Sequence, residues 1–288
     1  IWYALSLLIV IASLFAAFKL GLKQGIDFTG GALLEVEYQD NRPETSLAQK
    51  AIEDLDFGPA LIQPSGEKNF IIRMKDISEE QHQRILSAVS SLGTAKEIRF
   101  DSIGPVIGKE LKKKSIIAII LVVVMIILYI ALAFRKVSKP VNSFYYGLMA
   151  VVALIHDVSL PTGVFAVLGY YYGVEVDTLF VTALLTVLGF SVHDTIVVFD
   201  RVRENLKLAG EENFENTVGA SINQTISRSI NTSLTVILVL LAIFFLGGES
   251  TKYFSLALMI GVAIGTYSSI FLASPLLVTI EKWQSRGK

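Results

Sequence analysis

Cysteine is absent from the sequence of 288 residues, and histidine occurs only three times. The absence of cysteine excludes disulfide frameworks, cysteine-ligated zinc, iron–sulfur clusters and thiol nucleophiles. The formal net charge is −1, so no excess of basic charge favours nucleic acid as a partner. The phosphate-loop pattern Gly-x-x-x-x-Gly-Lys-[Ser/Thr] is also missing, so ATP is not the direct energy source of this chain. We expect neither a cofactor nor a metal ion.

Charged residues are scarce and unevenly distributed. They make up 18% of the sequence, against about 25% in soluble domains, and the mean hydropathy is +0.58. Residues 23–114 hold 15 acidic and 13 basic residues, which is 28 of the 51 charges. The other charges lie in or between long apolar runs. The sequence therefore predicts a polytopic helical membrane protein with one soluble domain inserted near its start.

Six apolar segments are long enough to span a membrane, since roughly 20 helical residues cross the hydrocarbon layer. We predict membrane helices at residues 1–20, 115–134, 144–171, 178–199, 227–246 and 253–280. Residues 21–114 then form the soluble domain, residues 115–280 a five-helix bundle and residues 281–288 a tail. The sequence begins inside an apolar run, which we interpret as a trimmed first membrane helix. A cleavable signal peptide is not expected, because no small-residue cleavage site follows.

The short connections between the predicted helices differ in charge. Basic residues gather in two of them and in the tail: Arg135, Lys136, Lys139, Arg201, Arg203, Lys207, Lys282, Arg286 and Lys288. The connections on the other side carry Glu175, Asp177, Glu249 and Lys252. Because basic loops stay in the cytoplasm, we expect both termini to be cytoplasmic and the soluble domain to be extracytoplasmic.

The soluble segment has the pattern of a small α+β domain. Leu34, Val36 and Tyr38 alternate with acidic residues, which is typical of a half-buried strand. Ser78 and Gln81 have the spacing of a capping box before a helix. Together with the remaining apolar patterns, these features predict the order strand, helix, strand, strand, helix, strand, which is that of a ferredoxin-like domain. The segment contains no recognisable catalytic cluster.

Three charges interrupt the apolar segments: Asp157, Asp194 and Arg228. Each costs about 2.5–3.5 kcal/mol to insert into a membrane, so a role in function or packing is expected. Asp194 and Arg228 lie on antiparallel helices that we expect to be joined by a cytoplasmic hairpin, so the two charges can reach similar depth. Arg228 belongs to a polar stripe at helical spacing, and we expect this stripe to face the interior of the bundle. Its members are Gln224, Arg228, Asn231 and Thr235.

The pair Asp194 and Arg228 has two interpretations. As a proton site, Asp194 is the titrating member, because arginine does not release its proton under ordinary conditions. Protonation would cancel the attraction and release Arg228, which would change how the two helices pack. As a static ion pair, the two side chains would only fix that packing.

A second polar pair, His156 and Asp157, lies in the predicted third helix. It is either a relay that supports Asp194 or a polar contact between helices. His193 precedes Asp194 but points about 100° away around the helix, so the two are not expected to bind one ion. Two aspartates on neighbouring membrane helices are also compatible with an intramembrane aspartyl protease. The sequences around Asp157 and Asp194 lack the Tyr-Asp and Gly-x-Gly-Asp contexts of such proteases.

A further pattern is Gly261-x-x-x-Gly265, followed by Ser269 one step along the same helix face. Small residues at this spacing allow two helices to approach closely. The pattern is compatible with packing inside the chain or with a face for a partner subunit.

Several longer motifs resemble the SecF family, the smaller of the paired SecD/SecF subunits of the bacterial protein-export machinery. GIDFTGG at residues 25–31 and IGPVIGKEL at residues 103–111 are similar to family sequences that flank the soluble domain. His156-Asp157 matches a pair in the third helix. DTIVVFDRVREN at residues 194–205 and INQTISR at residues 222–228 are the most specific blocks. The motifs occur in the family's order and extend over essentially the whole chain.

The resemblance implies half of an RND-type transporter, completed by SecD. It implies that the pair binds the SecYEG channel and uses the proton gradient across the bacterial cytoplasmic membrane to promote export of preproteins; it also admits a YidC-type insertase as a partner. Asp194 and Arg228 fall on the family's proton-coupling positions. Gln224, Asn231, His156, Asp157 and His193 form the expected supporting network. His193 stands where asparagine is expected in many members, so details of proton handling are not carried over unchanged.

The resemblance implies a transport subunit rather than an enzyme. It leaves open whether the chain is free-standing or part of a fused SecD–SecF polypeptide. Two rival functions are an RND-type exporter half for lipids or small molecules and the intramembrane protease. The long block around Asp194 argues against the first.

Overall fold

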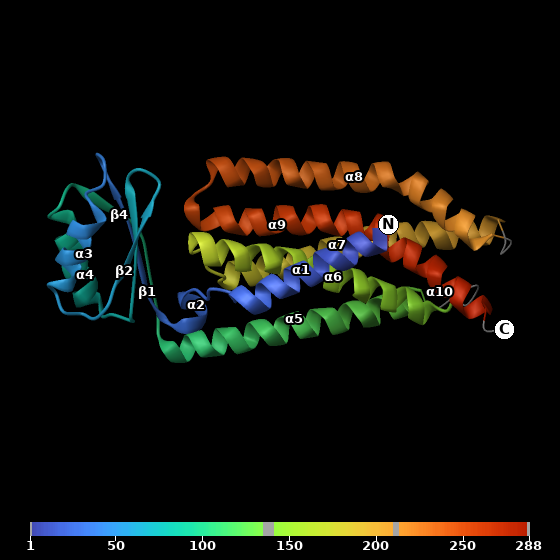
Figure 1. Ribbon diagram of the computed structural model, residues 1–288, viewed down its shortest axis with the longest axis horizontal. Coiled ribbons are helices and arrows are strands. Elements are labelled where there is room, and N and C mark those ends of the chain that lie inside the picture. The colour runs from blue at the N-terminus through green and yellow to red at the C-terminus, as the bar shows by residue number, and fades with distance from the viewer. Residues whose placement is uncertain (1, 135–140, 210–212, 287–288) are drawn as a thin grey trace. The chain divides into compact units, whose positions relative to one another are not determined.

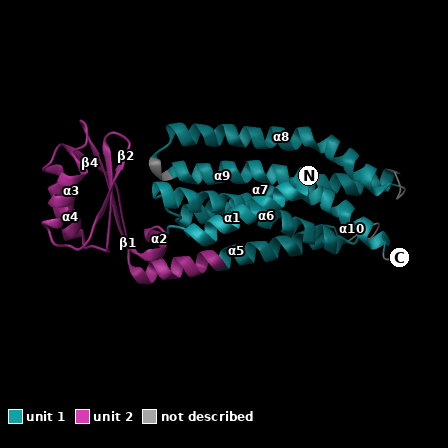
Figure 2. Cartoon of the chain, in the orientation of Figure 1, with its two compact units in different colours: residues 1–23, 117–288 teal, residues 24–116 magenta. Residues whose placement is uncertain are grey.

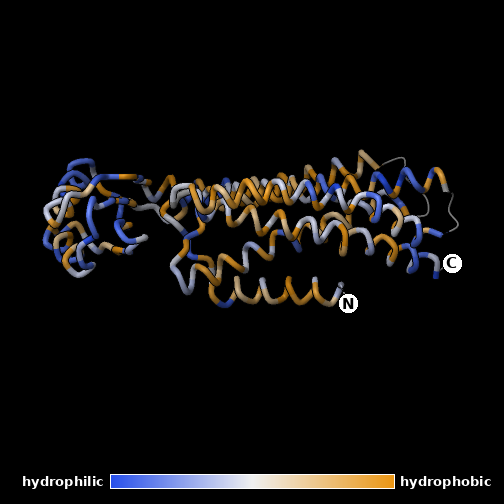
Figure 3. Tube along the Cα trace, turned by 90° about the horizontal axis from the view of Figure 1, so that it is seen from above, coloured by the Kyte–Doolittle hydropathy of each residue, from blue (hydrophilic) through white to orange (hydrophobic). Residues whose placement is uncertain are grey.

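The structure is a computed structural model that describes residues 2–134, 141–209 and 213–286, apart from the side chains of Ala209, Glu249 and Ser250. The chain forms two compact units (Figure 2). One consists of residues 1–23 and 117–288, and the other of residues 24–116. The hydropathy along the chain follows this division, with apolar residues dominating the long helices and polar residues frequent in the smaller unit (Figure 3).

The larger unit is built from long apolar helices (Figure 1). Within the described residues, six spans are long and apolar enough to cross a membrane, which confirms the predicted polytopic helical fold. The elements are α1 (Trp2–Leu20), α5 (Pro105–Ala133), α6 (Ser143–Tyr172), α7 (Thr178–Ala209), α8 (Phe214–Leu246), α9 (Glu249–Ser268), the π-helical segment η1 (Ser269–Ala273) and α10 (Ser274–Arg286). The sixth span runs through α9, η1 and α10. Of the basic residues in the predicted loops, Arg135, Lys136, Lys139 and Lys288 lie outside the described residues.

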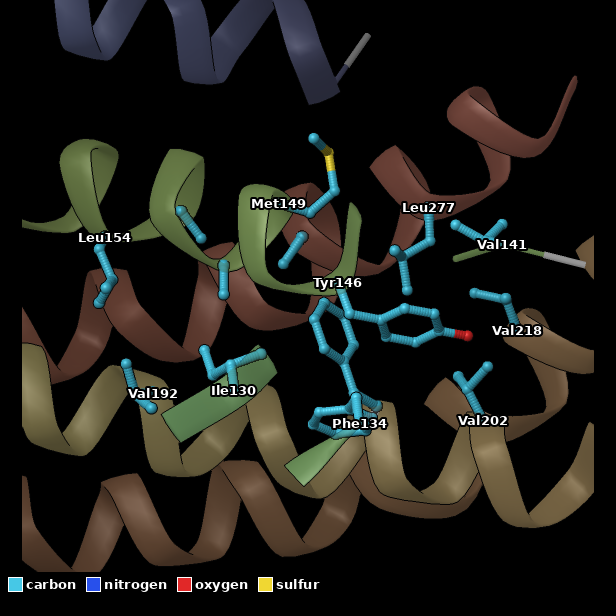
Figure 4. Close-up of a cluster of buried hydrophobic side chains, with 14 of the residues drawn as sticks. Ile130, Phe134, Val141, Tyr146, Met149, Leu154, Val192, Val202, Val218 and Leu277 are labelled. Atoms are coloured by element: carbon cyan, nitrogen blue, oxygen red, sulfur yellow. The ribbon is translucent and has the colours of Figure 1, made fainter. Parts of the chain in front are cut away.

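Helices α6, α7 and the span that begins with α9 form the centre of this unit, because half or more of each is buried. At one end of the bundle Phe134 stacks on Tyr146 with ring centroids 5.4 Å apart, inside a cluster of buried apolar side chains (Figure 4). The glycine pattern serves packing within the chain. A Cβ on Gly261 would lie 2.1 Å from Val187 Cγ2, and one on Gly265 would lie 3.1 Å from Ser191 Cβ. Glycine therefore lets α9 approach α7 at these two positions.

The smaller unit confirms the predicted α+β order. Its strands are β1 (Gly31–Tyr38), β2 (Leu61–Ser65), β3 (Asn69–Met74) and β4 (Ala95–Ile103), and its helices are α2 (Ile26–Thr29), α3 (Thr45–Glu53) and α4 (Glu79–Ser90). The sheet is antiparallel with the order β2-β3-β1-β4, in which Leu34 of β1 pairs with Ile72 of β3. The capping box of Ser78 and Gln81 opens α4 as predicted.

One side of this sheet packs against α3 and α4 through buried aliphatic side chains. Leu34, Val36 and Ile72 from the sheet meet Ile52 of α3 and Ile85 of α4 in one apolar cluster. The alternation of apolar and polar residues along β1 supplies the buried face. This core accounts for the spacing of the domain's apolar residues without any catalytic role.

The GIDFTGG motif brings the two ends of the smaller unit together. Gly30 and Gly31 both have positive φ angles, +76° and +133°. A Cβ on Gly30 would lie 2.7 Å from Pro105 Cα, at the start of α5, and one on Gly108 would lie 2.8 Å from the backbone nitrogen of Gly30. Only glycine allows this backbone conformation and this approach without strain. The motif therefore allows close backbone packing at the point where the chain enters and leaves the unit.

Candidate functional site: two buried acids in the helical bundle

The two intramembrane aspartates are buried in the centre of the helical unit. Asp157 of α6 is completely buried and Asp194 of α7 is 7% exposed. Ionised carboxylates are costly in an apolar interior unless donors surround them. The donors available to each acid therefore decide what each can do.

Asp157 has a complete set of donors. The neighbouring His156 ring places Nδ1 2.9 Å from Oδ1. Ser268 donates to Oδ2 from 2.8 Å, and Ser191 of α7 donates to the same oxygen. These contacts join α6, α7 and α9 at one point. Asp157 is thus a polar centre that fixes three helices, with His156 as part of the same group.

Asp194 is only partly satisfied. Ser229 of α8 donates to Oδ1 from 2.5 Å. The second oxygen, Oδ2, is buried and has no hydrogen-bond partner among the described residues. A buried acceptor without a donor is unfavourable by about 1–3 kcal/mol, and by more for a charged group. Binding a proton would relieve this cost, because a protonated carboxyl group carries less charge and can itself donate.

Arg228 acts on Asp194 through electrostatic attraction, but no ion pair joins them within the described part of the chain. Its side chain is exposed, as are Gln224, Asn231 and Thr235. The expectation that this stripe faces the interior of the bundle is therefore wrong for this chain. Gln224 instead accepts hydrogen bonds from Arg201 and Asn205 of α7, close to the α7–α8 connection.

The interior face of α8 carries small hydroxyl residues instead. Its buried members recur at intervals of four: Ser221, Thr225, Ser229 and Ser233. Because their side chains are short, they fit where α8 packs against α7 and α9. Ser221, Thr225 and Ser233 also donate to the carbonyl four residues earlier, which satisfies them within the helix. Gln224 and Arg228 each lie one residue before a member of this face, and thus about 100° around the helix, whereas Asn231 and Thr235 lie two residues on either side of Ser233.

His193 is exposed and turned away from the polar centre, as its position next to Asp194 predicted. Among the described residues no three histidine, aspartate or glutamate side chains gather in a way that could hold a metal ion. The two aspartates also bind different serines, and no hydrogen bond joins their carboxyl groups within the described residues. This is not the proton-sharing arrangement of an aspartyl protease.

Sequence reasoning located both acids but missed their serine partners. The spacing of four from Ser221 to Ser233 was a readable signal, since it marks one helix face. Ser268 gave no such signal, and Ser269 was marked only as a small residue in the stripe with Gly261 and Gly265, at the start of a π-helical segment. Such a segment shifts the helix register locally, and no residue pattern in the chain announces it.

Comparison with known proteins shows similarity along nearly the whole chain. Residues 83–283 match the family described as "Protein export membrane protein SecD/SecF, C-terminal", and residues 15–41 match "SecD/SecF GG Motif". The chain is 45% identical to the protein translocase subunit SecF of Thermobaculum terrenum, over 97% of this chain and 91% of that protein. It is 39% identical to SecF of Anaerolinea thermophila, over 100% of this chain and 95% of that protein.

A solved structure shows the same fold. The crystal structure of SecDF, a translocon-associated membrane protein from Thermus thermophilus, superimposes with a TM-score of 0.83 at 33% identity. The match includes 97% of this chain and 37% of the SecDF chain. The present chain thus corresponds to about one third of a longer polypeptide in that organism.

Proposed function

The chain belongs to the SecF family of protein translocase subunits, and from this premise we propose that it uses the proton gradient to promote protein export. Asp194 is the proton-carrying group in this proposal. The observation that carries it is the buried Oδ2 of Asp194, which has no hydrogen-bond partner among the residues that the structure describes, while Ser229 donates to Oδ1. A gradient of 100 mV supplies about 2.3 kcal/mol for each charge moved across the membrane. A few protons therefore supply enough free energy to bias a rigid-body change.

The exposed polar face of α8 supports a membrane-embedded partner. Arg228 and Asn231 lie on an apolar span but are not covered by this chain. Arginine in contact with lipid is costly, so we propose that a second subunit covers this face. SecD fits that role, because the matching SecDF chain joins a region like this one to a longer polypeptide. Together they would form the two halves of an RND-type transporter.

We further propose in which membrane the subunit lies, how it is oriented there and which proteins it contacts. The chain is a multi-pass membrane protein, and we place it in the bacterial cytoplasmic membrane with both termini in the cytoplasm. The α+β unit is then extracytoplasmic, where it meets the emerging preprotein beside the SecYEG channel. A YidC-type insertase is a further partner in this scheme. The role is coupling rather than catalysis, and the driving force is the gradient instead of a cofactor.

The test is protein export into membrane vesicles that contain SecD, SecYEG and this chain, with and without a proton gradient. Asp194→Asn and Arg228→Met are expected to reduce gradient-stimulated export to the level without a gradient. Asp200→Asn is a matched control, because Asp200 lies on the same helix but is exposed and paired with Arg203 at 2.6 Å. The proposal is wrong if both variants retain wild-type stimulation.

A further inference from the structure

The single histidine of the α+β unit is buried between α4 and β4. His82 lies in the first turns of α4 and is 3% exposed. Its ring is stacked on that of Phe100 of β4, with the ring centroids 3.7 Å apart and the planes inclined by 5°. This buried titratable side chain has no part in the proposed coupling at Asp194. What it can bind depends on its two ring nitrogens.

Both ring nitrogens of His82 face carboxylate oxygens. Nδ1 lies 3.1 Å from Oε1 of Glu79, which is on the same helix. Nε2 lies 3.0 Å from Oε2 of Glu97 on β4. An ionised carboxylate only accepts hydrogen bonds, and a neutral imidazole ring carries a single N–H. A ring that donates to both acids therefore holds two protons and a positive charge.

A β-bulge in β4 brings Glu97 and Phe100 to the same side of the sheet. On a regular strand, side chains three residues apart point to opposite faces. Glu97 and Arg99 are two residues apart on β4 but pair with neighbouring residues of β1, so β4 has one residue more than β1 at this point. A bulge of this kind changes the direction in which the following side chains point. Glu97 thus faces the helices together with Phe100 and reaches the histidine ring.

The two glutamates are the charged groups that contact the ring among the described residues. The other elements packed on this side of the sheet, β1 and α3, contribute mainly aliphatic side chains to the core. Tyr38 of β1 donates its hydroxyl to the backbone of α4. Arg84 of α4 lies over an aromatic ring, and Arg99 of β4 is paired with Asp101. The protonation of the ring is therefore governed by the two carboxylates and by burial.

The ligand that fits this arrangement is a proton. Two carboxylates on opposite nitrogens of one ring cannot bind a single metal ion together with it, and no such group of three exists in the described part of the chain. A second proton on the ring, by contrast, satisfies both acids at once. Its charge is also favoured by the face of the Phe100 ring. Water has access to the site, because the side chain of Glu79 is 71% exposed and that of Glu97 is 32% exposed.

We propose that His82 is a second proton-binding site, in which the doubly protonated ring fastens the start of α4 to β4. When the ring loses a proton, one nitrogen becomes an acceptor that faces a carboxylate without a proton to donate. That contact opens, and α4 loosens from β4. Histidine titrates near about pH 6.5 in water, so both contacts are present in mild acid and one is lost as pH rises.

The inference goes beyond the proposed function and rests on it in one respect, the orientation of the chain. With the α+β unit outside the cytoplasm, His82 would respond to the pH of the compartment from which protons enter. The site at Asp194 would use the proton gradient, whereas His82 would adjust the rigidity of the α+β unit to the proton concentration on its own side of the membrane.

The test uses the full chain assembled with SecD in lipid vesicles, at about pH 5.5 and about pH 8.5, on either side of the ordinary range of histidine. Nitrogen NMR of labelled histidine reports which ring nitrogens carry a proton, and His82→Gln identifies the signals of His82 by their loss. We expect two N–H groups at the lower pH and one at the higher pH. Amide protection at the start of α4 and around Glu97, corrected for the intrinsic rise of exchange with pH, is expected to fall about tenfold or more, as for the loss of a charged hydrogen bond.

Three variants separate the site from its surroundings. In His82→Gln the protection is expected to be independent of pH over this range, because glutamine does not titrate. In Glu97→Gln the change is expected to fall to less than half, because an amide can accept from a protonated nitrogen or donate to an unprotonated one. Glu67→Gln is the matched control, since Glu67 is exposed in the turn between β2 and β3. It is expected to retain the full change.

A His82 ring with one N–H at both pH values would overturn the inference, as would an equal fall in protection in Glu97→Gln and in the unaltered chain. If His82→Gln does not assemble, the exchange of Glu97→Gln decides alone, because Glu97 is partly exposed and its replacement leaves the apolar core intact. Neither readout depends on export. The proton site at Asp194 can therefore fail its export test while His82 passes, and the reverse is equally distinguishable.

Discussion

Asp157 and Asp194 are both aspartates in the middle of membrane helices, yet their surroundings differ. Asp157 is held by His156, Ser191 and Ser268, whereas within the described part of the chain Asp194 has one donor, Ser229, and one oxygen without a partner. The difference separates two uses of an intramembrane acid. A fully satisfied carboxylate fixes the helices that supply its donors. A partly satisfied carboxylate has two protonation states closer in free energy, which is what proton coupling requires.

The strongest test of this difference is the stability of two matched variants. Asp157→Asn removes the negative charge that Ser191, Ser268 and His156 surround and leaves only one acceptor oxygen for them, so we expect a loss of about 2–3 kcal/mol in the free energy of unfolding. Asp194→Asn can turn its amide toward the unpartnered side, so we expect less than about 1 kcal/mol. Reversible unfolding in mixed micelles measures both. Equal losses would mean that the two acids are not distinguished by their donors.

Substituting the serines that donate to the two aspartates tests the difference between Asp157 and Asp194 more directly. Ser229 is the only residue that donates to Asp194 Oδ1 among the described residues, whereas Ser191 is one of three donors to Asp157. Ser229→Ala is therefore expected to move the midpoint of the pH profile of gradient-driven export by about one unit. Ser191→Ala is expected to leave the profile in place and to lower stability by about 1 kcal/mol. The reverse pattern would assign the proton to Asp157.

Glu79 of α4, an acid outside the membrane-spanning helices, is expected to have the smallest effect on stability. Hydrogen bonds from Gln83 and His82 lower the pKa of Glu79 below its ordinary value. A lowered pKa in the folded state means that the contribution to stability is present above the unfolded pKa and is lost as pH falls through the folded value. Because Glu79 is exposed, water screens it. We expect only local loosening of the first turn of α4 in acid, seen as faster amide exchange, and Glu79→Gln should abolish the pH dependence of that exchange.

The sequence was a good guide to features with a strong periodic signal. Six apolar runs predicted the six spans, and alternation in residues 34–38 with the capping box at Ser78 predicted the α+β unit. The two buried acids were recognisable because charge is rare in an apolar run. The outward face of α8 was not predictable from hydropathy, because a polar stripe avoids lipid equally well against its own bundle or a partner.

The close contact of Gly30 with Pro105 has a consequence for how the chain is assembled and how it can vary. The segment that enters the α+β unit and the segment that leaves it meet at one point, and Lys112 also donates to Gln24 there at 3.0 Å. A domain whose two ends are adjacent can fold as a closed unit and be exchanged without lengthening or straining its host. The glycine motif thus makes residues 24–116 a replaceable cassette. Different domains could be inserted between the same helices through this one junction.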